Sequence, residues 1–401
     1  MNATSIPKLG IIGGGQLARM LAFSAHRLGI PCYVLSPRRD DAAAEVVKHH
    51  ICADIHDQDA LQKLMTHCTV ITFESENITE NTLELLAQSS CSCLPHPLTA
   101  MQPLARRHSQ KKLLASYNLP ITPYLDVTQQ QQGGESLVRY IKERLSLPAV
   151  LKTSKGGYDG RATFIIHPQK PDHLDLLTAF LSKYAMIPLI AEKYVDFSKE
   201  IAITMARNAR GDIHTLPAVE TYQKDYQCDW VKGPLETKKE LKDHLSKLKT
   251  AITHMLHHIQ YIGVITFELF VLHDQSVWIN EVAPRVHNSA HYSMNALDIS
   301  QFDLHIMSLF NMPLPIDYRL RSPGFAMTNL IGKGEHHMPL IQNSDTFLHR
   351  YDKKEARRGR KMGHINALAP STEEALKKAL TAREDLYKHL RIQNDINLLY
   401  T

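Results

Sequence analysis

Several features that would narrow the function of this chain at once are missing from its sequence. No run of about 18 apolar residues occurs, so we expect no membrane-spanning helix. The chain reaches a predicted strand at 9–12 without a basic region followed by an apolar run, so we expect no signal peptide. The six cysteines, at 32, 52, 68, 91, 93 and 228, include no CxxC pair, which indicates free thiols of a cytoplasmic protein rather than disulfides or a zinc knuckle.

A strong charge of either sign is also absent. Lys and Arg number 46 against 41 Asp and Glu, giving a net charge of +5 over 401 residues. This mild excess suits small anionic substrates, but it is weak support for nucleic-acid binding, which usually needs a clustered basic face. The 23 histidines are scattered, without the HExxH spacing of a helical zinc site. With 43% hydrophobic and 22% charged residues, we expect a soluble globular protein of about two to four domains.

Residues 6–36 predict a strand, a glycine turn, a helix and a second strand. Backbone N–H groups at such a turn can bind an anion at the N-terminus of the helix. The turn Gly13-Gly-Gly-Gln16 suggests a dinucleotide fingerprint, but Ala18 stands at its third glycine position and Ser36-Pro37 replaces the expected acidic residue. A nicotinamide-dependent oxidoreductase therefore stays open as one alternative.

Polar residues follow the next predicted strand, at 70–73. Glu74 and Asn77 lie where the carboxyl ends of parallel strands place ligands in open α/β sheets. Asn77 can equally be the cap of a helix predicted over 80–87.

A glycine-rich segment joins two predicted strands at 148–152 and 162–167. The segment 153–161 lacks the GK[ST] of a P-loop and precedes a strand, so we interpret it as a hairpin tip whose backbone can close on phosphates. Lys152, at the strand end, can neutralise phosphate charge. A solvated tip is the alternative. Two further strands, at 189–195 and 200–206, are predicted to pair with each other.

The segment 263–282 predicts a buried hairpin closed by a turn at 273–276. If residue 272 pairs with 277 in an unbulged register, Glu268 lies opposite Glu281. Two facing carboxylates need a cation between them, or one must stay protonated. Mg²⁺ takes such oxygen sites, completing its shell with phosphates and water. The alternative is a slipped register in which one glutamate faces solvent. An amphipathic helix over 241–259 is predicted to pack on this hairpin.

A proline ends the second strand of this hairpin, and a group of hydrogen-bond donors follows it. Arg285, His287 and Asn288 offer a guanidinium fork, an imidazole and an amide. Together these groups suit a small planar anion.

Three blocks of the sequence resemble one family. The block Asn280-Glu-Val-Ala-Pro-Arg-Val-His-Asn-Ser289 resembles the signature of the N5-carboxyaminoimidazole ribonucleotide synthetase family, which are ATP-grasp enzymes. Residues 152–161 resemble the phosphate-covering loop of that family, and the basic stretch 351–364 resembles its C-terminal phosphate-binding block. The implied fold is α/β and α+β, an ATP-grasp fold. Its expected divisions are a Rossmann-like domain at 1–104, a small lobe at 105–190, a catalytic lobe at 191–322 and a C-terminal domain at 323–401.

The resemblance implies an ATP-dependent carbon–nitrogen ligase. Its substrates would be 5-aminoimidazole ribonucleotide and bicarbonate, and its products N5-carboxyaminoimidazole ribonucleotide, ADP and phosphate, formed through carboxyphosphate in purine biosynthesis. ATP and Mg²⁺ are the implied cofactors, and a cytoplasmic homodimer without membrane or nucleic-acid partners is the implied setting. Another ATP-grasp ligase acting on a phosphoribosyl amine and a non-catalytic nucleotide-binding module stay as alternatives.

The resemblance also assigns roles to individual residues. It implies catalytic contacts to bicarbonate from Arg285, His287 and Asn288, and magnesium on Glu268 and Glu281. It implies that the ribonucleotide contacts Gln16, Glu74, Asn77, Tyr158, Asp159, Arg161, Lys353 and Arg360, the last two at the 5′-phosphate. It implies that ATP contacts Arg107, Lys152, Gly157, Tyr158, Asp159, Gly160, Arg161, Ala162, Thr163, Glu192, Lys193, Tyr194, Val195, Glu200, Gln223, Asn280 and Glu281.

Some positions depart from the family or allow a simpler interpretation. Ala162-Thr163 replaces the usual Gly-Gln, and Gln223 lies in a stretch that lacks the family's Asn and His. Strand alternation would turn Asn280 to the face opposite Glu281. Glu192 can be a surface residue of an alternating strand, and the stretch 349–364 can be a solvated face.

Overall fold

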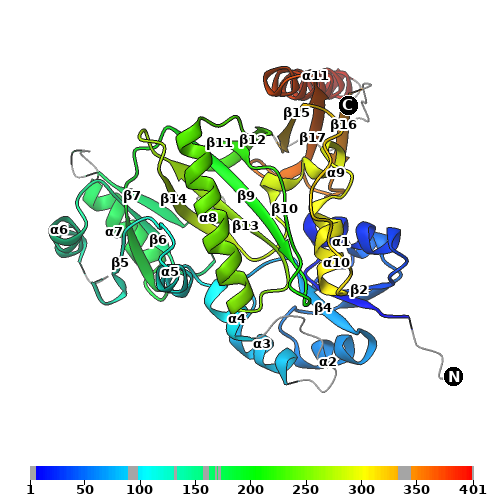
Figure 1. Ribbon diagram of the computed structural model, residues 1–401, viewed down its shortest axis with the longest axis horizontal. Coiled ribbons are helices and arrows are strands. Elements are labelled where there is room, and N and C mark those ends of the chain that lie inside the picture. Colours follow the sequence, from blue (N-terminus) through cyan, green and yellow to red (C-terminus); the bar gives the residue numbers. More distant parts are fainter. Residues whose placement is uncertain are drawn as a thin grey trace.

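The computed structural model describes residues 6–88, 98–130, 133–156, 162–167, 169, 173–332 and 345–399. The strands of these residues form three sheets, and helices pack against them (Figure 1). No helix in these ranges is both long and apolar enough to cross a membrane. The mixture of parallel and antiparallel sheets agrees with the expected combination of α/β and α+β architecture.

The N-terminal sheet is parallel and has the strand order β3-β2-β1-β4. Its strand β1 is buried along its whole length, as expected where helices cover a parallel sheet. Thr79, not Asn77, caps α3, because its hydroxyl accepts the Thr82 N–H at 3.2 Å, so the capping interpretation of Asn77 is wrong. The elements are β1 (Leu9–Ile12), α1 (Gln16–Arg27), β2 (Cys32–Ser36), η1 (Ala44–Val46), β3 (His49–Cys52), α2 (Gln58–His67), β4 (Val70–Phe73), α3 (Glu80–Ala87) and α4 (Leu98–Leu104).

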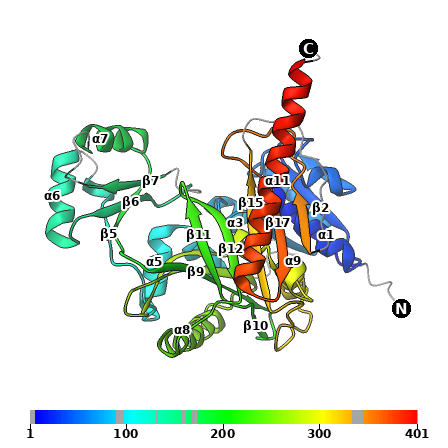
Figure 2. The same ribbon diagram turned by 90° about the horizontal axis from the view of Figure 1, so that it is seen from above.

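A second, antiparallel sheet has the order β5-β8-β6-β7. With α6 and α7 it forms a lobe at one end of the molecule, which Figures 1 and 2 both show. The strands predicted around the glycine-rich segment are confirmed as β6 and β7. The elements of this part are α5 (Arg107–Ser116), β5 (Tyr124–Asp126), η2 (Thr128–Gln130), α6 (Gly134–Arg144), β6 (Ala149–Thr153), β7 (Thr163–Ile166), α7 (His173–Lys183) and β8 (Leu189–Lys193).

The third sheet is nine-stranded, in the order β14-β13-β9-β11-β12-β15-β17-β16, with β10 beside β9. It runs unbroken across residue 322, because β12 pairs with β15. Its strands are β9 (Lys199–Arg207), β10 (Ile213–Thr215), β11 (Val219–Lys224), β12 (Gln227–Gly233), β13 (Gly263–Val271), β14 (Val277–Ala283), β15 (Gly324–Ile331), β16 (Thr346–Arg350) and β17 (Lys361–Ala369). Its helices are α8 (Lys239–His258), η3 (Asn288–Ala290), α9 (Ser293–Ala296), α10 (Gln301–Leu309) and α11 (Thr372–Leu399).

Two predicted strands that were expected to pair lie in different sheets. β8 pairs with β5 and β6, whereas β9 pairs with β10, β11 and β13. The prediction that 189–195 pairs with 200–206 is therefore wrong. Both strands are largely buried. Their apolar residues predict this burial but do not indicate which strand lies beside each of them.

The predicted hairpin forms, but through a different register. Val271 pairs with Val277, one residue out of the expected alignment, and a bulge at Asn280 then brings Glu268 opposite Glu281. The bulge makes up the offset, so the predicted carboxylate pair is confirmed. The bulge also changes the direction of the side chains, so that Asn280 and Glu281 both line one cleft. The expectation that Asn280 faces away from Glu281 is therefore wrong. The predicted amphipathic helix is confirmed as α8, whose leucines share a core with both strands.

Helix α10 joins the N-terminal domain to the large sheet. Its residue Asp303 forms a capping box with Ser300, accepts a hydrogen bond from Ser24 of α1, and pairs with Arg27 at 2.6 Å. Two residues further along the helix, His305 contacts Thr72 of β4 at 2.8 Å and accepts the Val264 N–H at 3.0 Å. The helix therefore fixes how the parallel sheet lies against the hairpin (Figure 1).

We predict that Asp303→Ala lowers the free energy of unfolding by about 2 kcal/mol, because the change removes one half of a capping box and leaves the buried Ser24 hydroxyl without its acceptor. Denaturant unfolding measures the effect. The matched control is Asp298→Ala, whose carboxylate is 47% exposed in a pair with Arg321 and should change the stability by less than about 0.5 kcal/mol. Equal losses in the two variants would contradict the role given to Asp303.

Candidate active site

A cleft of about 1330 Å³ lies where the three sheets meet. Its walls come from the start of α1, from β6 to β9, from the β11–β12 hairpin, from β13 and β14, and from the segments 285–291 and 353–361. The structure brings most of the sequence-predicted residues to this one space. They are Gln16, Arg107, Lys152, Thr163, Glu192, Lys193, Tyr194, Val195, Glu200, Gln223, Glu268, Asn280, Glu281, Arg285, His287, Asn288, Lys353 and Arg360.

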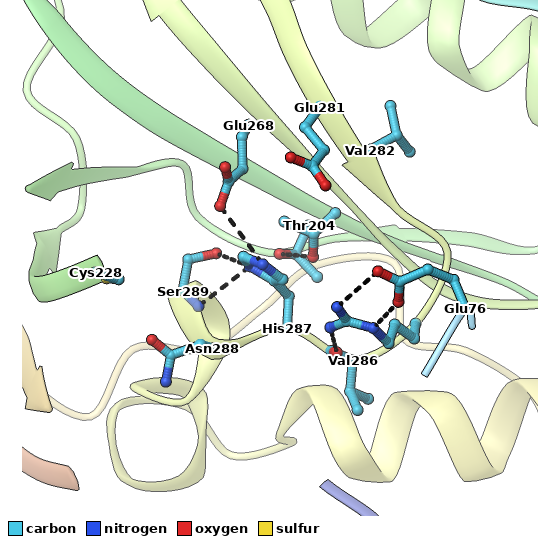
Figure 3. Close-up of polar contacts among 12 residues, drawn as sticks. Glu76, Thr204, Cys228, Glu268, Glu281, Val282, Val286, His287, Asn288 and Ser289 are labelled. Carbon is cyan, nitrogen blue, oxygen red and sulfur yellow. Dashed lines mark hydrogen bonds and ion pairs between the residues drawn. The ribbon is translucent and has the colours of Figure 1, made fainter. Parts of the chain in front are cut away.

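Three carboxylates line one wall of the cleft. Glu268 and Glu281 face each other on paired strands and point into the same space in Figure 3, and Glu200 lies on the neighbouring strand β9. Burial raises the pKa of Glu268 to about 7, and the charges of Glu281 and Glu200 add to the effect. Burial also raises the pKa of Glu200 to about 7. The wall thus has the unfavourable concentration of negative charge that a bound cation relieves.

Cationic side chains surround these carboxylates. Arg107, at the start of α5, pairs with Glu281 at 2.7 Å. Lys152 donates to Glu192 at 2.8 Å and to the Asn280 amide oxygen at 2.9 Å, and Lys111 pairs with the other Glu192 oxygen at 3.1 Å. Glu192 is 2% exposed, so the interpretation of it as a surface residue is wrong. Its carboxylate holds Lys152 in place, and the buried Lys111, which the sequence did not suggest, supports it from behind the cleft lining.

The neutral imidazole of His287 lies between Ser289 and Glu268 (Figure 3). Burial and the charges of Arg285 and Lys361 lower the pKa of His287 to about 3. Its Nδ1 accepts the Ser289 N–H at 3.3 Å, which leaves the proton of the neutral ring on Nε2, 3.5 Å from Glu268 Oε1. The imidazole therefore presents an N–H donor beside the paired carboxylates.

Asn288 and Arg285 are each held by a residue from another part of the chain. The amide of Asn288 exchanges hydrogen bonds with that of Asn329 on β15, at 2.9 and 2.7 Å. The Arg285 guanidinium makes two hydrogen bonds to the carboxylate of Glu76, from the loop after β4. Burial raises the pKa of Glu76, but the charge and hydrogen bonds of Arg285 outweigh burial and lower it to about 2. Sequence reasoning missed Glu76, although a buried arginine requires a nearby carboxylate.

The glycine turn before α1 holds a carboxylate of the chain itself. Glu74 Oε2 accepts the Gly15 N–H at 2.6 Å, and a Cβ at Gly15 would lie 2.1 Å from Glu74 Oε1. The anion position at this helix N-terminus is therefore occupied, which argues against the dinucleotide alternative. Neither Glu74 nor the exposed Asn77 is among the described residues that line the cleft, so their substrate contacts stay predictions.

The basic C-terminal stretch also lines the cleft. Lys353 and Arg360 reach the cleft together with Arg357, Arg358 and Lys361. The interpretation of this stretch as only a solvated face is therefore wrong. Near β8 the lining turns apolar and aromatic, with Val150, Ile165, Tyr194, Phe197 and Phe270, and the last two rings stack at 4.6 Å.

Five of the predicted site residues lie outside the described residues, namely Gly157, Tyr158, Asp159, Gly160 and Arg161. Ala162 is described and buried, and Thr163, beside it on β7, lines the cleft.

Comparisons with known proteins agree with this architecture. Sequence models of three domain families match the chain: the ribonucleotide synthetase preATP-grasp domain at 6–102, the ATP-grasp domain at 112–302, and the phosphoribosylaminoimidazole carboxylase C-terminal domain at 326–378. The expected fold class is thereby confirmed.

Whole-chain relatives share one description. The N5-carboxyaminoimidazole ribonucleotide synthase of Synechococcus elongatus is 34% identical over 94% of this chain and 94% of its own length. That of Staphylococcus aureus (strain MRSA252) is 33% identical over 90% and 92%. Among solved structures, the S. aureus synthetase complexed with ADP has a TM-score of 0.82 at 30% identity, covering 94% of this chain and 96% of its own. The Aspergillus clavatus enzyme in complex with ADP and 5-aminoimidazole ribonucleotide has a TM-score of 0.81 at 27% identity, covering 96% and 99%.

We predict that Glu76→Gln lowers the free energy of unfolding by about 3 kcal/mol at pH 7.5, because the change leaves the Arg285 charge uncompensated. A carboxylate with a depressed folded-state pKa stabilises the protein above its unfolded pKa, and this stabilisation is lost as the pH falls toward the folded value of about 2. Urea unfolding should therefore show the gap between wild type and variant narrowing below about pH 4.5.

The matched control for this prediction is Glu80→Gln. The Glu80 side chain is 52% exposed and pairs with Arg106 at the surface, so its loss should have little effect at any pH. A gap between wild type and Glu76→Gln that stays constant with pH would contradict the buried ion pair.

Proposed function

The chain belongs to the N5-carboxyaminoimidazole ribonucleotide synthase family, and from this membership we propose that it carboxylates 5-aminoimidazole ribonucleotide in an ATP-dependent reaction of purine biosynthesis. One cleft holds three groups of side chains that support the proposal. They are a carboxylate wall (Glu200, Glu268 and Glu281), a donor cluster (Arg285, His287 and Asn288) and a basic rim (Lys353, Arg357, Arg358, Arg360 and Lys361). These three groups match the charges of a metal-bound triphosphate, a small planar anion and a sugar phosphate.

ATP is proposed to lie from the aromatic end of the cleft toward the paired glutamates. The adenine fits between the apolar residues beside β8, where the backbone of Glu192 to Val195 can read the edge of the base. Glu200 is placed to accept from the ribose hydroxyls. Lys152, held by Glu192 and Asn280, and Arg107 supply positive charge for the phosphates.

Magnesium fits the carboxylate wall. Glu268 and Glu281 offer two hard oxygen donors on paired strands. Burial raises the pKa of Glu268, and the charges of Glu281 and Glu200 raise it further, a repulsion that a cation would remove. Among the described residues no group of three or more His, Cys, Asp or Glu side chains forms a complete metal site, so the ion would share its shell with phosphate oxygens and water. When bound, Mg²⁺ would neutralise phosphate charge and orient the γ-phosphate.

Bicarbonate is proposed to bind beside the glutamates at Arg285, His287 and Asn288. One bicarbonate oxygen attacks the γ-phosphorus, a new oxygen–phosphorus bond forms, and ADP leaves. The products of this step are ADP and carboxyphosphate. The exocyclic amine of the ribonucleotide then attacks the carboxyl carbon, either in carboxyphosphate or in CO₂ released from it. Phosphate departs, and the amine loses one proton. The protein contributes by positioning and by charge, and the Nε2–H of neutral His287 can donate to the anion.

The ribonucleotide is proposed to lie between the basic rim and α1. Lys353 and Arg360 would contact its 5′-phosphate, and Gln16, the first residue of α1, would contact the ribonucleotide from the other side. This arrangement brings the amine toward the donor cluster, where the carboxyl group is generated.

The assay that tests the proposal measures ADP release with bicarbonate and 5-aminoimidazole ribonucleotide, and identifies the product by mass. Release that depends on both compounds, with a carboxylated product, supports it. Equal release with glycinamide ribonucleotide and formate would favour another ATP-grasp ligase. ATP binding without any turnover would favour a non-catalytic module.

We predict that Glu281→Gln reduces substrate-dependent ADP release by about 10²-fold or more, because the change replaces one of the two proposed carboxylate donors with a neutral amide. Initial rates at saturating ATP measure the effect. Glu240→Gln, on the exposed face of α8, is the control and should retain wild-type activity. Near-normal turnover in Glu281→Gln would contradict the proposed metal role.

We predict that Lys353→Met raises the KM for the ribonucleotide by about tenfold while leaving the KM for ATP near the wild-type value, because only the sugar-phosphate contact loses its charge. The neighbouring Lys354, whose side chain is 63% exposed, offers a matched control as Lys354→Met. If both variants shift the ribonucleotide KM equally, the rim acts through general charge and not through Lys353.

A further inference from the structure

Two buried glutamines hold the ends of the segment 282–287, which runs from the carboxylate wall to the donor cluster. Gln110 of α5 is 5% exposed, and Gln301, the first residue of α10, is fully buried. Each side-chain amide forms paired hydrogen bonds with the backbone of one residue, Val282 for Gln110 and His287 for Gln301. Arg285 lies between these two attachment points.

Gln110 takes the place of a neighbouring strand at the edge of the large sheet. Its Oε1 accepts the Val282 N–H at 3.0 Å, and its Nε2 donates to the Val282 carbonyl at 2.8 Å. Because β14 is the edge strand, these backbone groups would otherwise lack a ladder partner on that side. The bonds fix the strand directly after Glu281.

Both the oxygen and the nitrogen of the Gln301 amide form hydrogen bonds with the loop that carries the donor cluster. Its Oε1 accepts the His287 N–H at 2.8 Å, while its Nε2 donates to the His287 carbonyl and to His291 Nδ1, each at 2.8 Å. A backbone N–H can only donate, so the orientation of the amide is determined. The backbone N–H of Gln301 also donates to Ser293 Oγ at 3.0 Å. Residues 287–293 therefore fold around this one residue.

The consequence concerns the anion site. With the His287 backbone held on both its N–H and its C=O, the imidazole stays between Ser289 and Glu268, and the Asn288 amide stays on Asn329. Displacing catalytic groups by about 1 Å can cost about 10²-fold in rate. We propose that Gln301 is a positioning residue that presets His287 and Asn288 for bicarbonate, an inference that rests on the function proposed above.

The test replaces Gln301 with a side chain of similar shape that makes no hydrogen bonds, Gln301→Met. We expect the KM for bicarbonate to rise about tenfold or more, with the KM for ATP within about twofold of wild type. We also expect more ADP per carboxylated product, because a misplaced carboxyphosphate is lost to water before the amine attacks. Thermal unfolding and circular dichroism establish that the variant is folded.

Two comparison variants separate positioning from general stability. Ser308→Ala removes a buried hydroxyl that donates to the Leu304 carbonyl within the same helix, and should leave the bicarbonate KM unchanged. Gln110→Met loosens the other end of the segment, next to Glu281, and should raise the KM for ATP more than that for bicarbonate. Gln301→Met should thus raise mainly the KM for bicarbonate, and Gln110→Met mainly the KM for ATP. A merely structural role of the two glutamines would not produce this difference.

A folded Gln301→Met protein with wild-type bicarbonate KM and wild-type ADP-to-product ratio overturns the proposal. So does an equal rise in the KM of all three substrates. If the methionine variant does not fold, Gln301→Glu takes its place. It keeps the acceptor for the His287 N–H but loses both donors, and an unchanged bicarbonate KM in it overturns the proposal equally. Failure of the proposed function is seen separately, as wild-type protein that releases no ADP in response to the ribonucleotide.

Discussion

The pairing of Glu268 with Glu281 is the constraint on which the rest of the cleft depends. Two carboxylates opposite each other in an apolar hairpin repel, and burial together with this repulsion raises the pKa of Glu268 to about 7. The fold tolerates this arrangement because α8 shares an apolar core with the hairpin, and because the positive charge of Arg107 offsets the negative charge of Glu281. The bulge at Asn280 completes the arrangement by turning a third polar side chain to the same face, where it holds Lys152.

Contacts between distant parts of the chain keep the opposite charges in place. Arg285, in the segment after β14, is tied to Glu76 in the loop after β4, and Lys152 on β6 is tied to Glu192 and Asn280. Helix α10 adds Asp303 and His305 as further links to the N-terminal sheet. The site is thus assembled from parts of the chain that would not form it alone, which explains why so many buried charges have partners more than a hundred residues away.

The sequence predicted those features that follow from local pattern. Periodicity located α8 and the hairpin, and the resemblance placed Lys152, Glu281, Arg285 and Lys353 in one site. The predicted pairing of β8 with β9 was wrong, because an apolar pattern indicates that a strand is buried but does not indicate which strand lies beside it. Glu268 did come opposite Glu281, although the expected register was one residue out at the turn and a bulge restored the match.

Other parts of the site could not be predicted, for physical reasons. Glu76, Lys111, Gln110 and Gln301 carry no motif, and their importance lies in hydrogen bonds to residues far along the chain. A glutamine that binds backbone groups has the same sequence signal as one on a surface, so only the tertiary arrangement identifies it. Glu74 illustrates the reverse case, since its position after a parallel strand suggested a ligand contact, yet its carboxylate closes the glycine turn.

The cleft is proposed to direct a bicarbonate oxygen onto the γ-phosphorus of ATP before carbon–nitrogen bond formation. Turnover with bicarbonate labelled with ¹⁸O at all its oxygens tests this most directly. If carboxyphosphate forms and then gives up its carboxyl group, the attacking oxygen stays on phosphorus, and mass spectrometry will find one ¹⁸O in the released phosphate. Carboxylated product accompanied by unlabelled phosphate would contradict the account.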